Sequence, residues 1–448
     1  MKTLFLTSFH GYISRNLLLT DFFRILSARE GLRLVIIVPK GKKNYFETHF
    51  ARSSVVIEEV SFDTPSSISF ASLVMKRAAK YGLNSRSTAI ERRIKWKREG
   101  HFFYFLVLSL LAYTMSSHRV FRRILRGLDF YLAPKNRYRD LFLRYQPDAV
   151  FATDLLNERD VEVLHHARRV GVRVLGMIRS WDNLTLHGLL RVIPDQLFVS
   201  SPRVRDLAAS MHDVPSEDIT IVGVPHYDRY LRGTAESRIS IQRRLGLDPL
   251  RKTLFWAPIS DHYLSVNDAD PYVFRILGGL GDMQVIVRFS PTLGVASLKD
   301  AKPYPNMLLD RPSQHYQESG GELPEEDEER FVHEILSSDV VICGPSTVAM
   351  DAMVMGRSVI IVALHEHPRT YLEGIYRRYD FDHFKFMLDC GATRVVKTKS
   401  ELLDEIDACI KNPQRDQGGR VKFLDAYAGP RDGRCGARLA STLLACIE

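Results

Sequence analysis

The stretch VVICGPSTVAMDAMVMG at residues 340–356, followed by SVIIV at 358–362, decides the fold predicted for this chain. A short apolar run leads into Gly344-Pro345-Ser346-Thr347, a helical stretch follows, and Gly356 ends it before a second apolar run. This order predicts strand, helix and strand of a parallel α/β sheet. Ser346 or Thr347 would cap the helix, whose amino end favours an anionic group at the carboxyl edge of the sheet. The same residues also fit a capped β-α-β unit that binds nothing.

Length and composition indicate a globular protein with two large domains. The chain has 448 residues, of which 45% are hydrophobic and 26% charged. Its five cysteines form no CxxC pair, which argues against a disulfide framework or zinc site and for a reducing compartment. Residues 1–11 read as a strand and not as a signal peptide, and the apolar run 102–115 is shorter than the roughly 20 residues that cross a bilayer. We therefore expect a cytoplasmic protein that is not integral to the membrane.

The net charge of +9 is concentrated in one segment. Residues 76–126 hold thirteen Lys and Arg against two Glu, so the rest of the chain is close to neutral. Apolar helices flanked by basic and aromatic residues suit an anionic bilayer, so we expect this segment to hold the protein peripherally on the inner face of the plasma membrane. A buried helical hairpin with a solvated basic face is the alternative. No recognised nucleic-acid-binding motif is present, and we expect no nucleic acid partner.

Strands alternate with helices along both halves of the chain and predict two parallel α/β domains. Domain 1–235 would contain a basic, apolar helical insertion at 88–130, a polar linker would precede domain 250–430, and 431–448 would form a last helix. The expected strands are 3–9, 34–39, 55–60, 149–152, 172–178, 195–200, 219–222, 253–258, 284–291, 340–343, 358–362 and 393–396. The expected helices include 16–27, 158–169, 202–211, 331–336, 400–410 and 437–447, and 313–329 is expected to be an exposed acidic loop.

Polar residues follow several strands of the first domain, at the edge where ligands of a parallel sheet gather. The loop 10–15 leaves the first strand and is a candidate wall of a site. Asp154 and Asp182 leave the ends of two nearby strands, where a carboxylate can take a proton from an attacking hydroxyl. Each aspartate also fits a helix N-cap. We expect the cap for Asp154 and leave both roles open for Asp182.

The turn 344–347, with Asp351 one helical turn after Thr347, resembles the donor-side element of GT-B glycosyltransferases. Four more elements are similar to the arm of that superfamily with CDP-glycerol glycerophosphotransferases and capsule or surface-polysaccharide transferases, namely Ser-Trp-Asp-Asn at 180–183, Gly-Val-Pro-x-Tyr-Asp at 223–228, Val-Arg-x-Ser-Pro at 287–291 and Asp-Gly-Arg-x3-Arg at 432–438. The chain departs from that arm at Ser290, where a histidine often stands. Without this imidazole a general acid is missing, so a sugar donor is favoured over glycerophosphate.

The resemblance implies an enzyme of two Rossmann-like domains, in which the second binds a nucleotide-activated donor and the first a lipid-linked or glycan acceptor. The last helix would cross back to the first domain, and catalysis would need no metal or cofactor. The donor-binding candidates are Gly344, Ser346, Thr347, Asp351, Arg288, Ser290 and Glu366. The acceptor-side candidates are His10, Gly11, Arg15, Trp181 and Asn183.

Three short stretches have the spacing of metal ligands, and we expect none of them to bind a metal. The Asp-x-Asp pairs at 268–270 and 380–382 match a GT-A metal motif, but neither follows a clear buried strand. The histidines of 365–367 are two residues apart and follow the strand 358–362. Contact with the donor, or simple solvation, is the role expected for these histidines.

The sequence therefore leads to the hypothesis of an inverting, metal-independent glycosyltransferase in surface-polysaccharide synthesis. Asp182 would deprotonate the acceptor hydroxyl, with Asp154 as second choice, and the helix end at Ser346 with Arg288 would stabilise the leaving diphosphate. A CDP-glycerol-type glycerophosphotransferase, a UDP-N-acetylglucosamine 2-epimerase-like isomerase and a non-catalytic module of an envelope-assembly complex remain alternatives. The basic segment argues against the epimerase, because a small-molecule isomerase has no use for a lipid-facing patch.

Overall fold

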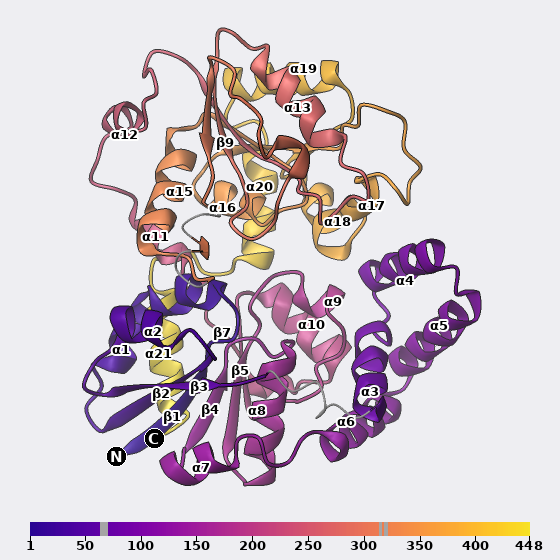
Figure 1. Ribbon diagram of the computed structural model, residues 1–448, viewed down its shortest axis with the longest axis vertical. Coiled ribbons are helices and arrows are strands. Elements are labelled where there is room, and N and C mark those ends of the chain that lie inside the picture. The colour runs from indigo at the N-terminus through magenta and orange to yellow at the C-terminus, as the bar shows by residue number, and fades with distance from the viewer. Residues whose placement is uncertain (63–69, 313–315, 318–320) are drawn as a thin grey trace. The chain divides into compact units, whose positions relative to one another are not determined.

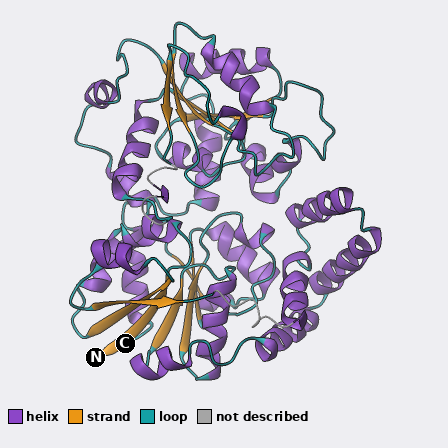
Figure 2. Cartoon of the chain, viewed as in Figure 1, coloured by secondary structure: helices purple, strands orange, loops and turns teal. Residues whose placement is uncertain are grey.

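The computed structural model describes residues 1–62, 70–312, 316–317 and 321–448. The chain divides into two compact units (Figure 1): unit 1 comprises Met1–Asp228 and Asp425–Glu448, and unit 2 comprises Arg229–Leu424. Each unit contains one parallel sheet flanked by helices (Figure 2). The predicted α/β class, with two Rossmann-like domains, is therefore confirmed.

Parallel strands form the sheet of unit 1 in the order β3-β2-β1-β4-β5-β6-β7. Residues Leu34 to Val38 of the second strand are all fully buried, so both faces of the sheet are covered. This burial explains the uninterrupted apolar runs from which the strands were predicted. The strands are β1 (Lys2–Thr7), β2 (Leu32–Pro39), β3 (Val55–Val60), β4 (Ala149–Ala152), β5 (Arg173–Met177), β6 (Gln196–Val199) and β7 (Ile219–Ile221).

The helix expected over residues 16–27 is wrong as a single element. A π-helix, η1 (Ser14–Leu18), ends at Leu19, and α1 (Asp21–Ser27) starts after Thr20, whose hydroxyl accepts a hydrogen bond from the Phe22 amide. The other helices that begin in unit 1 are α2 (Lys43–Phe50), α3 (Phe70–Tyr81), α4 (Arg86–Glu99), α5 (Phe102–Ser117), α6 (Arg119–Leu132), α7 (Arg139–Tyr145), α8 (Glu158–Arg169), α9 (Asn183–Leu186), α10 (Pro202–His212), η3 (Ser216–Asp218), α11 (Tyr227–Arg232) and α21 (Cys435–Ala445).

The last helix of the chain, α21, packs in the core of unit 1. Leu439 and Leu443 are fully buried in the same apolar cluster as Phe22 of α1. The Asp228 carboxylate accepts hydrogen bonds from the Cys435 and Gly436 amides at 2.9 and 2.8 Å, which satisfies two free amides at the start of α21. The predicted crossing of the C-terminal helix back to the first domain is confirmed.

The parallel sheet of unit 2 has the order β10-β9-β8-β11-β12-β13. Its strands are β8 (Thr253–Ala257), β9 (Gln284–Arg288), β10 (Met307–Asp310), β11 (Val340–Cys343), β12 (Ser358–Val362) and β13 (Arg394–Val396). Its helices are α12 (Arg238–Arg244), α13 (Ala269–Gly278), η4 (Ala296–Leu298), α15 (Glu325–Ser337), α16 (Val348–Val354), α17 (Tyr376–Tyr379), α18 (Asp382–Asp389), α19 (Lys399–Lys411) and α20 (Gln417–Tyr427), the last of which ends in unit 1.

Two parts of unit 2 differ from the prediction. The edge strand β10 was not expected. The acidic residues 325–329 are not loop but the first turns of α15, and Asp327 and Glu328 are buried there. The rest of the predicted loop lies partly outside the described residues. Acidic side chains stabilise the amino end of a helix, which explains how so polar a stretch can be helical.

None of the helices in the described residues is long and apolar enough to span a bilayer.

Candidate functional site

Each sheet has one point where the order of its strands reverses, and ligands of open parallel sheets bind beside such points. In unit 1 this point lies between β1 and β4, and in unit 2 between β8 and β11. The loop 8–13 and Asp154 follow the first pair of strands, whereas the loops 258–262 and 344–347 follow the second pair. The topology therefore places several of the predicted residues at the two switch points.

A buried polar lock joins the ends of β1 and β4 in unit 1. The Thr7 hydroxyl donates to the Asp160 carboxylate and accepts from the Thr153 amide, and the Thr153 hydroxyl donates to the Thr7 carbonyl at 2.9 Å. Burial, reinforced by the nearby Asp154 charge, raises the pKa of Asp160 well above its usual range. The lock fixes the backbone on both sides of the switch point.

The sequence predicted that Asp154 caps a helix, and this prediction is wrong. The N-cap of α8 is Asn157, and Asp154 instead accepts a hydrogen bond from Arg179 Nε at 2.7 Å. The Asn183 amide lies 3.4 Å from the other carboxylate oxygen. Burial alone would lower the pKa of Arg179, but the Asp154 carboxylate outweighs it and raises that pKa. Asp154 is itself buried, so it holds Arg179 and Asn183 in place at the edge of the sheet.

Asp182 occupies the N-cap position of α9, but its side chain makes no capping hydrogen bond. One carboxylate oxygen lies 3.5 Å from Nε2 of His187, and the Asp182 side chain keeps 23% of its surface exposed. Desolvation opposes protonation of His187, yet the Asp182 carboxylate more than compensates and raises the pKa of this imidazole. The preceding Trp181 is buried edge-on against Tyr427.

His10, Gly11 and Arg15 form the loop after β1 and the start of η1. The His10 ring stacks on Tyr12, and its Nδ1 accepts a hydrogen bond from the Tyr12 amide at 3.2 Å. Burial, followed by the Arg179 charge, lowers the pKa of His10 to about 4. His10 is therefore a neutral imidazole at pH 7, electrostatically coupled to Asp154 and His187 of the same edge.

The segment 183–190 joins this edge to the basic helices. The Leu189 amide donates to the Ala79 carbonyl of α3 at 2.9 Å, and the Ser85 hydroxyl at the start of α4 donates to the Thr185 carbonyl. Gly188 has a φ of +101°, and a Cβ there would lie 2.5 Å from the Lys80 Cα. Only glycine allows this contact with the backbone of α3. The segment that follows Asp182 is thus packed directly against the basic insertion.

In unit 2, Gly344 follows β11 and permits a close approach between the two switch-point loops. A Cβ at Gly344 would lie 2.6 Å from Cγ1 of Ile259, in the loop after β8. Thr347 is the N-cap of α16 but makes no side-chain cap bond, whereas the Ser346 hydroxyl accepts from the Val348 amide at 3.3 Å. Asp351 is buried on α16. Of the two capping residues predicted, the one that makes the bond is Ser346.

Arg288 does not point to a ligand at this edge. It is buried, and its guanidinium forms ion pairs with Asp310, with Asp327 at 2.7 Å and with Glu334 at 3.2 Å. Burial would lower the pKa of Arg288, but these carboxylates raise it. Its two terminal nitrogens already donate to these carboxylates, which favours a structural role over the phosphate contact predicted for it. Ser290 accepts hydrogen bonds from the Thr292 and Leu293 amides.

The residues with metal-ligand spacing are engaged in hydrogen bonds. Asp268 accepts from Nδ1 of His365 at 2.9 Å, and Nε2 of His365 accepts from the Ile375 amide, so both ring nitrogens are used. Asp270 accepts from the Ile259 and Ser260 amides and holds the loop after β8. Glu366 pairs with Arg275 on the surface. The described part of the chain contains no group of three or more metal-ligating side chains.

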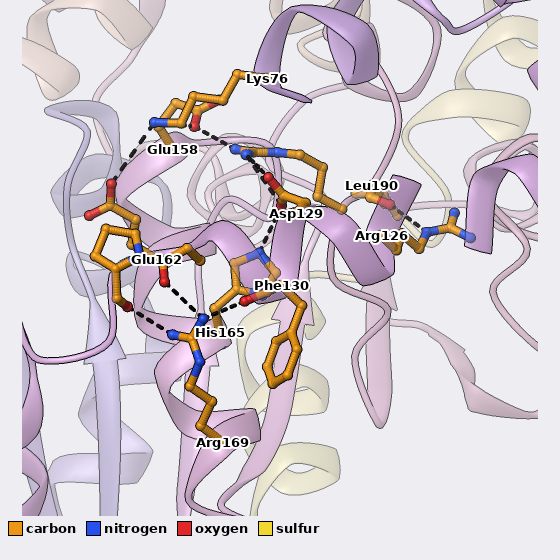
Figure 3. A network of polar contacts seen from close by, with 12 residues as sticks. Lys76, Arg126, Asp129, Phe130, Glu158, Glu162, His165, Arg169 and Leu190 are labelled. Carbon is orange, nitrogen blue, oxygen red and sulfur yellow. Dashed lines mark hydrogen bonds and ion pairs between the residues drawn. The ribbon is translucent and has the colours of Figure 1, made fainter. Parts of the chain in front are cut away.

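The helix α6 buries two charged residues, Arg122 and Asp129, and exposes most of its apolar residues. Asp129 is 2% exposed and accepts from His165 of α8 at 2.8 Å and from Arg191 at 3.1 Å. Burial raises its pKa, but the contact with His165, followed by the Arg191 charge, brings it below the usual range. Figure 3 shows this network, in which Lys76 of α3 also reaches Glu158 of α8. Breaking such buried pairs is costly, so they fix the rotation of α6.

Apolar side chains of both α6 and α5 are exposed to water. On α6 they are Val120, Phe121, Ile124, Leu128 and Tyr131, and on α5 they are Phe103, Leu106, Val107, Leu110 and Tyr113, at helical spacing. We call these ten residues the apolar face. Soluble proteins rarely expose so many neighbouring apolar residues without a partner. This exposure differs from what the alternative of a buried helical hairpin with a solvated basic face would give.

The insertion is less basic at its surface than its sequence suggested. Arg92 is buried and donates to the Tyr81 and Leu83 carbonyls, while Arg122 and Arg126 bind Asp213. The basic residues that remain exposed are Arg77, Lys80, Arg86, Arg93, Lys97, Arg98, Arg119 and Arg123. They still outnumber the acidic residues around the apolar face.

No protein-family model and no curated protein sequence matches this chain. Solved structures do match. The UDP-GlcNAc 2-epimerase from Neisseria meningitidis bound to UDP-GlcNAc is 11% identical with a TM-score of 0.53, and the UDP-GlcNAc 2-epimerase from Methanocaldococcus jannaschii is 11% identical with a TM-score of 0.51. Each match covers 99% of this chain and 100% of the other. The wall teichoic acid polymerase TagF is 12% identical, with a TM-score of 0.49 over 100% of this chain and 89% of that one.

The chain has the predicted GT-B fold of two Rossmann-like domains. At 11% sequence identity the similarity shows the fold alone and leaves the reaction open.

Proposed function

We propose that this protein is a glycosyltransferase that moves a sugar from a nucleotide-activated donor to a membrane-associated acceptor in cell-surface glycan synthesis. One observation supports this best: the segment after Asp182 is hydrogen-bonded to α3 and α4, and these helices belong to the insertion that carries the apolar face. The proposed catalytic edge of unit 1 and its proposed membrane contact are parts of one packed region. A soluble small-molecule enzyme has no need of such a coupling.

In the proposed reaction Asp182 is the general base. Its carboxylate accepts the proton of the acceptor hydroxyl, the acceptor oxygen forms a bond to the anomeric carbon of the sugar, and the bond to the nucleoside diphosphate breaks with inversion. The diphosphate leaves with the electron pair. His187 sits beside Asp182 and orients it, while Asp154 positions Arg179. No metal is needed for these steps.

We propose that the loop 344–347 binds the nucleotide-activated donor, because it lies at the switch point of unit 2. Ser346, Thr347 and Asp351 are the residues retained from the sequence hypothesis, with Ser290 and Glu366 on neighbouring loops. Arg288 is left out, because its guanidinium is buried among carboxylates.

The decisive test is Asp182→Asn. We expect sugar transfer to fall by about 10² to 10⁴-fold, the usual contribution of a general base, while the donor still raises the melting temperature. Asp206→Asn, an exposed aspartate on α10, is the matched control and should keep full activity. Unchanged turnover in the Asp182 variant would exclude Asp182 as the base.

The membrane part of the proposal places the protein peripherally on the inner face of the plasma membrane. Replacing Val107 and Leu110 of the apolar face by serine should abolish flotation with anionic vesicles and leave the melting temperature unchanged, because both side chains are exposed. Flotation of this variant equal to that of the wild type would remove the apolar face from the proposal.

A UDP-N-acetylglucosamine 2-epimerase-like activity is the second candidate, favoured by the full-length fold similarity to two such enzymes. Incubation with UDP-N-acetylglucosamine alone would then yield the epimer. A CDP-glycerol-type glycerophosphotransferase would instead show a preference for CDP-glycerol in a nucleotide panel. A donor at a hundred times its Kd stabilises the folded protein by about 2.7 kcal/mol, which a thermal shift resolves.

A further inference from the structure

We propose that a hollow at the turn between α4 and α5 binds the phosphate-bearing headgroup of an anionic membrane lipid. The hollow has a volume of about 690 Å³, and its lining includes Arg77, Lys95, Glu99, His101, Phe103 and Tyr104. The inference rests on the membrane contact proposed above and names the lipid class that this contact would select.

A caged lysine is the central feature of this hollow. The Lys95 ammonium lies 5.0 Å from the ring centroid of Tyr81 and 5.1 Å from that of Tyr104, so two aromatic faces hold it. Its side chain is 23% exposed, and its nearest carboxylate, Glu99, is 3.8 Å away. An ammonium fixed in this way presents its remaining donors in a defined direction, unlike a freely moving surface lysine.

The charges around the hollow favour an anion. Arg77 and Lys95 line it against the single carboxylate of Glu99, and Lys97 and Arg98 are exposed on the same last turns of α4. The 16-residue helix α5 starts at the hollow, and no side chain caps its first turn. The positive end of its dipole adds to the side-chain charges.

The position of the hollow suits a lipid better than a soluble anion. Phe103, on its lining, is 81% exposed and begins the line of apolar residues that continues along α5 through Val107 and Leu110. A charged hollow is therefore continuous with an apolar face, and an amphiphile has the same two parts. A phosphate seated against Lys95 would leave its acyl chains beside Phe103 and the rest of the apolar face.

The test is partitioning of the full-length protein onto phosphatidylcholine vesicles with and without phosphatidylglycerol. Arg77→Gln with Lys95→Gln and Lys97→Gln with Arg98→Gln each remove two positive charges, but only the first pair lines the hollow. Both should weaken binding to the anionic vesicles, because each basic residue near the surface contributes, and we expect the first pair to be about tenfold weaker than the second. Equal losses would overturn the headgroup site while leaving the membrane contact in place.

A second variant protects the test against misfolding. Glu99→Gln removes the only carboxylate of the lining from a half-exposed position, so the fold should be kept and binding to phosphatidylglycerol vesicles should rise severalfold. An unchanged or weaker partitioning would contradict the proposal.

Competition with inorganic phosphate is the last experiment. Displacement of the protein from vesicles by millimolar phosphate at constant ionic strength would assign the hollow to free anions instead of lipid. If the wild type binds no anionic vesicles, the proposed membrane contact fails as well, whereas sugar transfer to a soluble acceptor remains testable separately.

Discussion

The carboxyl edges of the two sheets differ in how they use charged residues. In unit 1, Asp182 and His187 keep part of their side chains at the surface, and His10 is held as a neutral ring beside them. In unit 2, the strongest cation at the edge, Arg288, is turned inward to a cluster of carboxylates. Both edges have the same topology. The strand order thus determines where a site can be, and the helix packed beside each strand end determines which side chains reach it.

The helix responsible in unit 2 is α15. Its residues Asp327 and Glu334 face Arg288, and burial raises the pKa of Glu334 to about 7 despite the nearby guanidinium. In unit 1 the corresponding residue is Asp160 of α8, which accepts hydrogen bonds from the Thr7 hydroxyl and the Asp154 amide. Because Asp160 binds neutral groups, it does not draw the charged side chains of that edge into the interior.

The largest expected effect on stability comes from replacing Arg288. Arg288→Met removes the buried cation that Asp310, Asp327 and Glu334 share, although Asp310 and Glu334 still pair with Arg330. The change should lower the free energy of unfolding of unit 2 by about 3–5 kcal/mol. Urea unfolding measures it. Arg275→Met, which removes an exposed ion pair, should cost less than about 1 kcal/mol. A loss of donor affinity in Arg288→Met at unchanged stability would instead make Arg288 a phosphate ligand.

Two buried groups, one in each unit, should contribute to the pH dependence of stability in opposite directions. His212 accepts from the Leu190 amide and donates to the Leu184 carbonyl, and burial lowers its pKa to about 4. The unfolded chain binds this proton first, so unit 1 should lose about 3 kcal/mol as the pH falls from 6.5 to 4. The raised pKa of Glu334 has the opposite sign, and its contribution in unit 2 is lost as the pH rises toward 7.

Hydrogen exchange read separately in the two units measures this pH response. His212→Gln should reduce the acid-induced loss in unit 1, leaving the part that comes from His10, and should not alter unit 2. Parallel pH curves for the two units would show that His212 and Glu334 do not govern their stabilities.

Two glycines distinguish a rigid contact from one that can adapt. Gly188→Ala places a methyl group against the backbone of α3 at a positive φ, and we expect a loss of about 1–3 kcal/mol that no second change relieves. In Gly344→Ala the added methyl group contacts the side chain of Ile259 instead. A second change, Ile259→Ala, should therefore restore part of the lost free energy of unfolding. Thermal unfolding of the single and double variants gives the coupling. Strict additivity at Gly344 and Ile259 would refute the assigned contact.

The smallest effect on stability is expected at Asp182. Its contact with His187 is 3.5 Å long and partly exposed, so Asp182→Asn should change the free energy of unfolding by less than about 1 kcal/mol. Asp154→Asn, which weakens a buried contact to Arg179, should cost about 1–3 kcal/mol. Denaturant midpoints of the two variants compare them directly. A greater loss for Asp182 would assign it to structure and not to catalysis.

The sequence alone determined the two parallel sheets and the loops that leave them, because a strand buried on both faces needs a continuous apolar run and a helix start needs capping residues. It also located the basic segment, since composition is local. Short or polar elements such as β10 and the first turns of α15 were not predicted from the sequence, because their stability comes from neighbours distant in the chain.

Only the tertiary structure decided how individual charged residues are used. Arg288 ends β9 and Asp182 follows β5. Yet Arg288 meets three carboxylates from other elements, whereas Asp182 lies beside the half-exposed His187. The outward apolar face of α6 is equally invisible in the sequence, because its orientation depends on ion pairs to α8 and Arg191. Helical periodicity tells which residues share a face, and only long-range partners determine which face turns toward the protein.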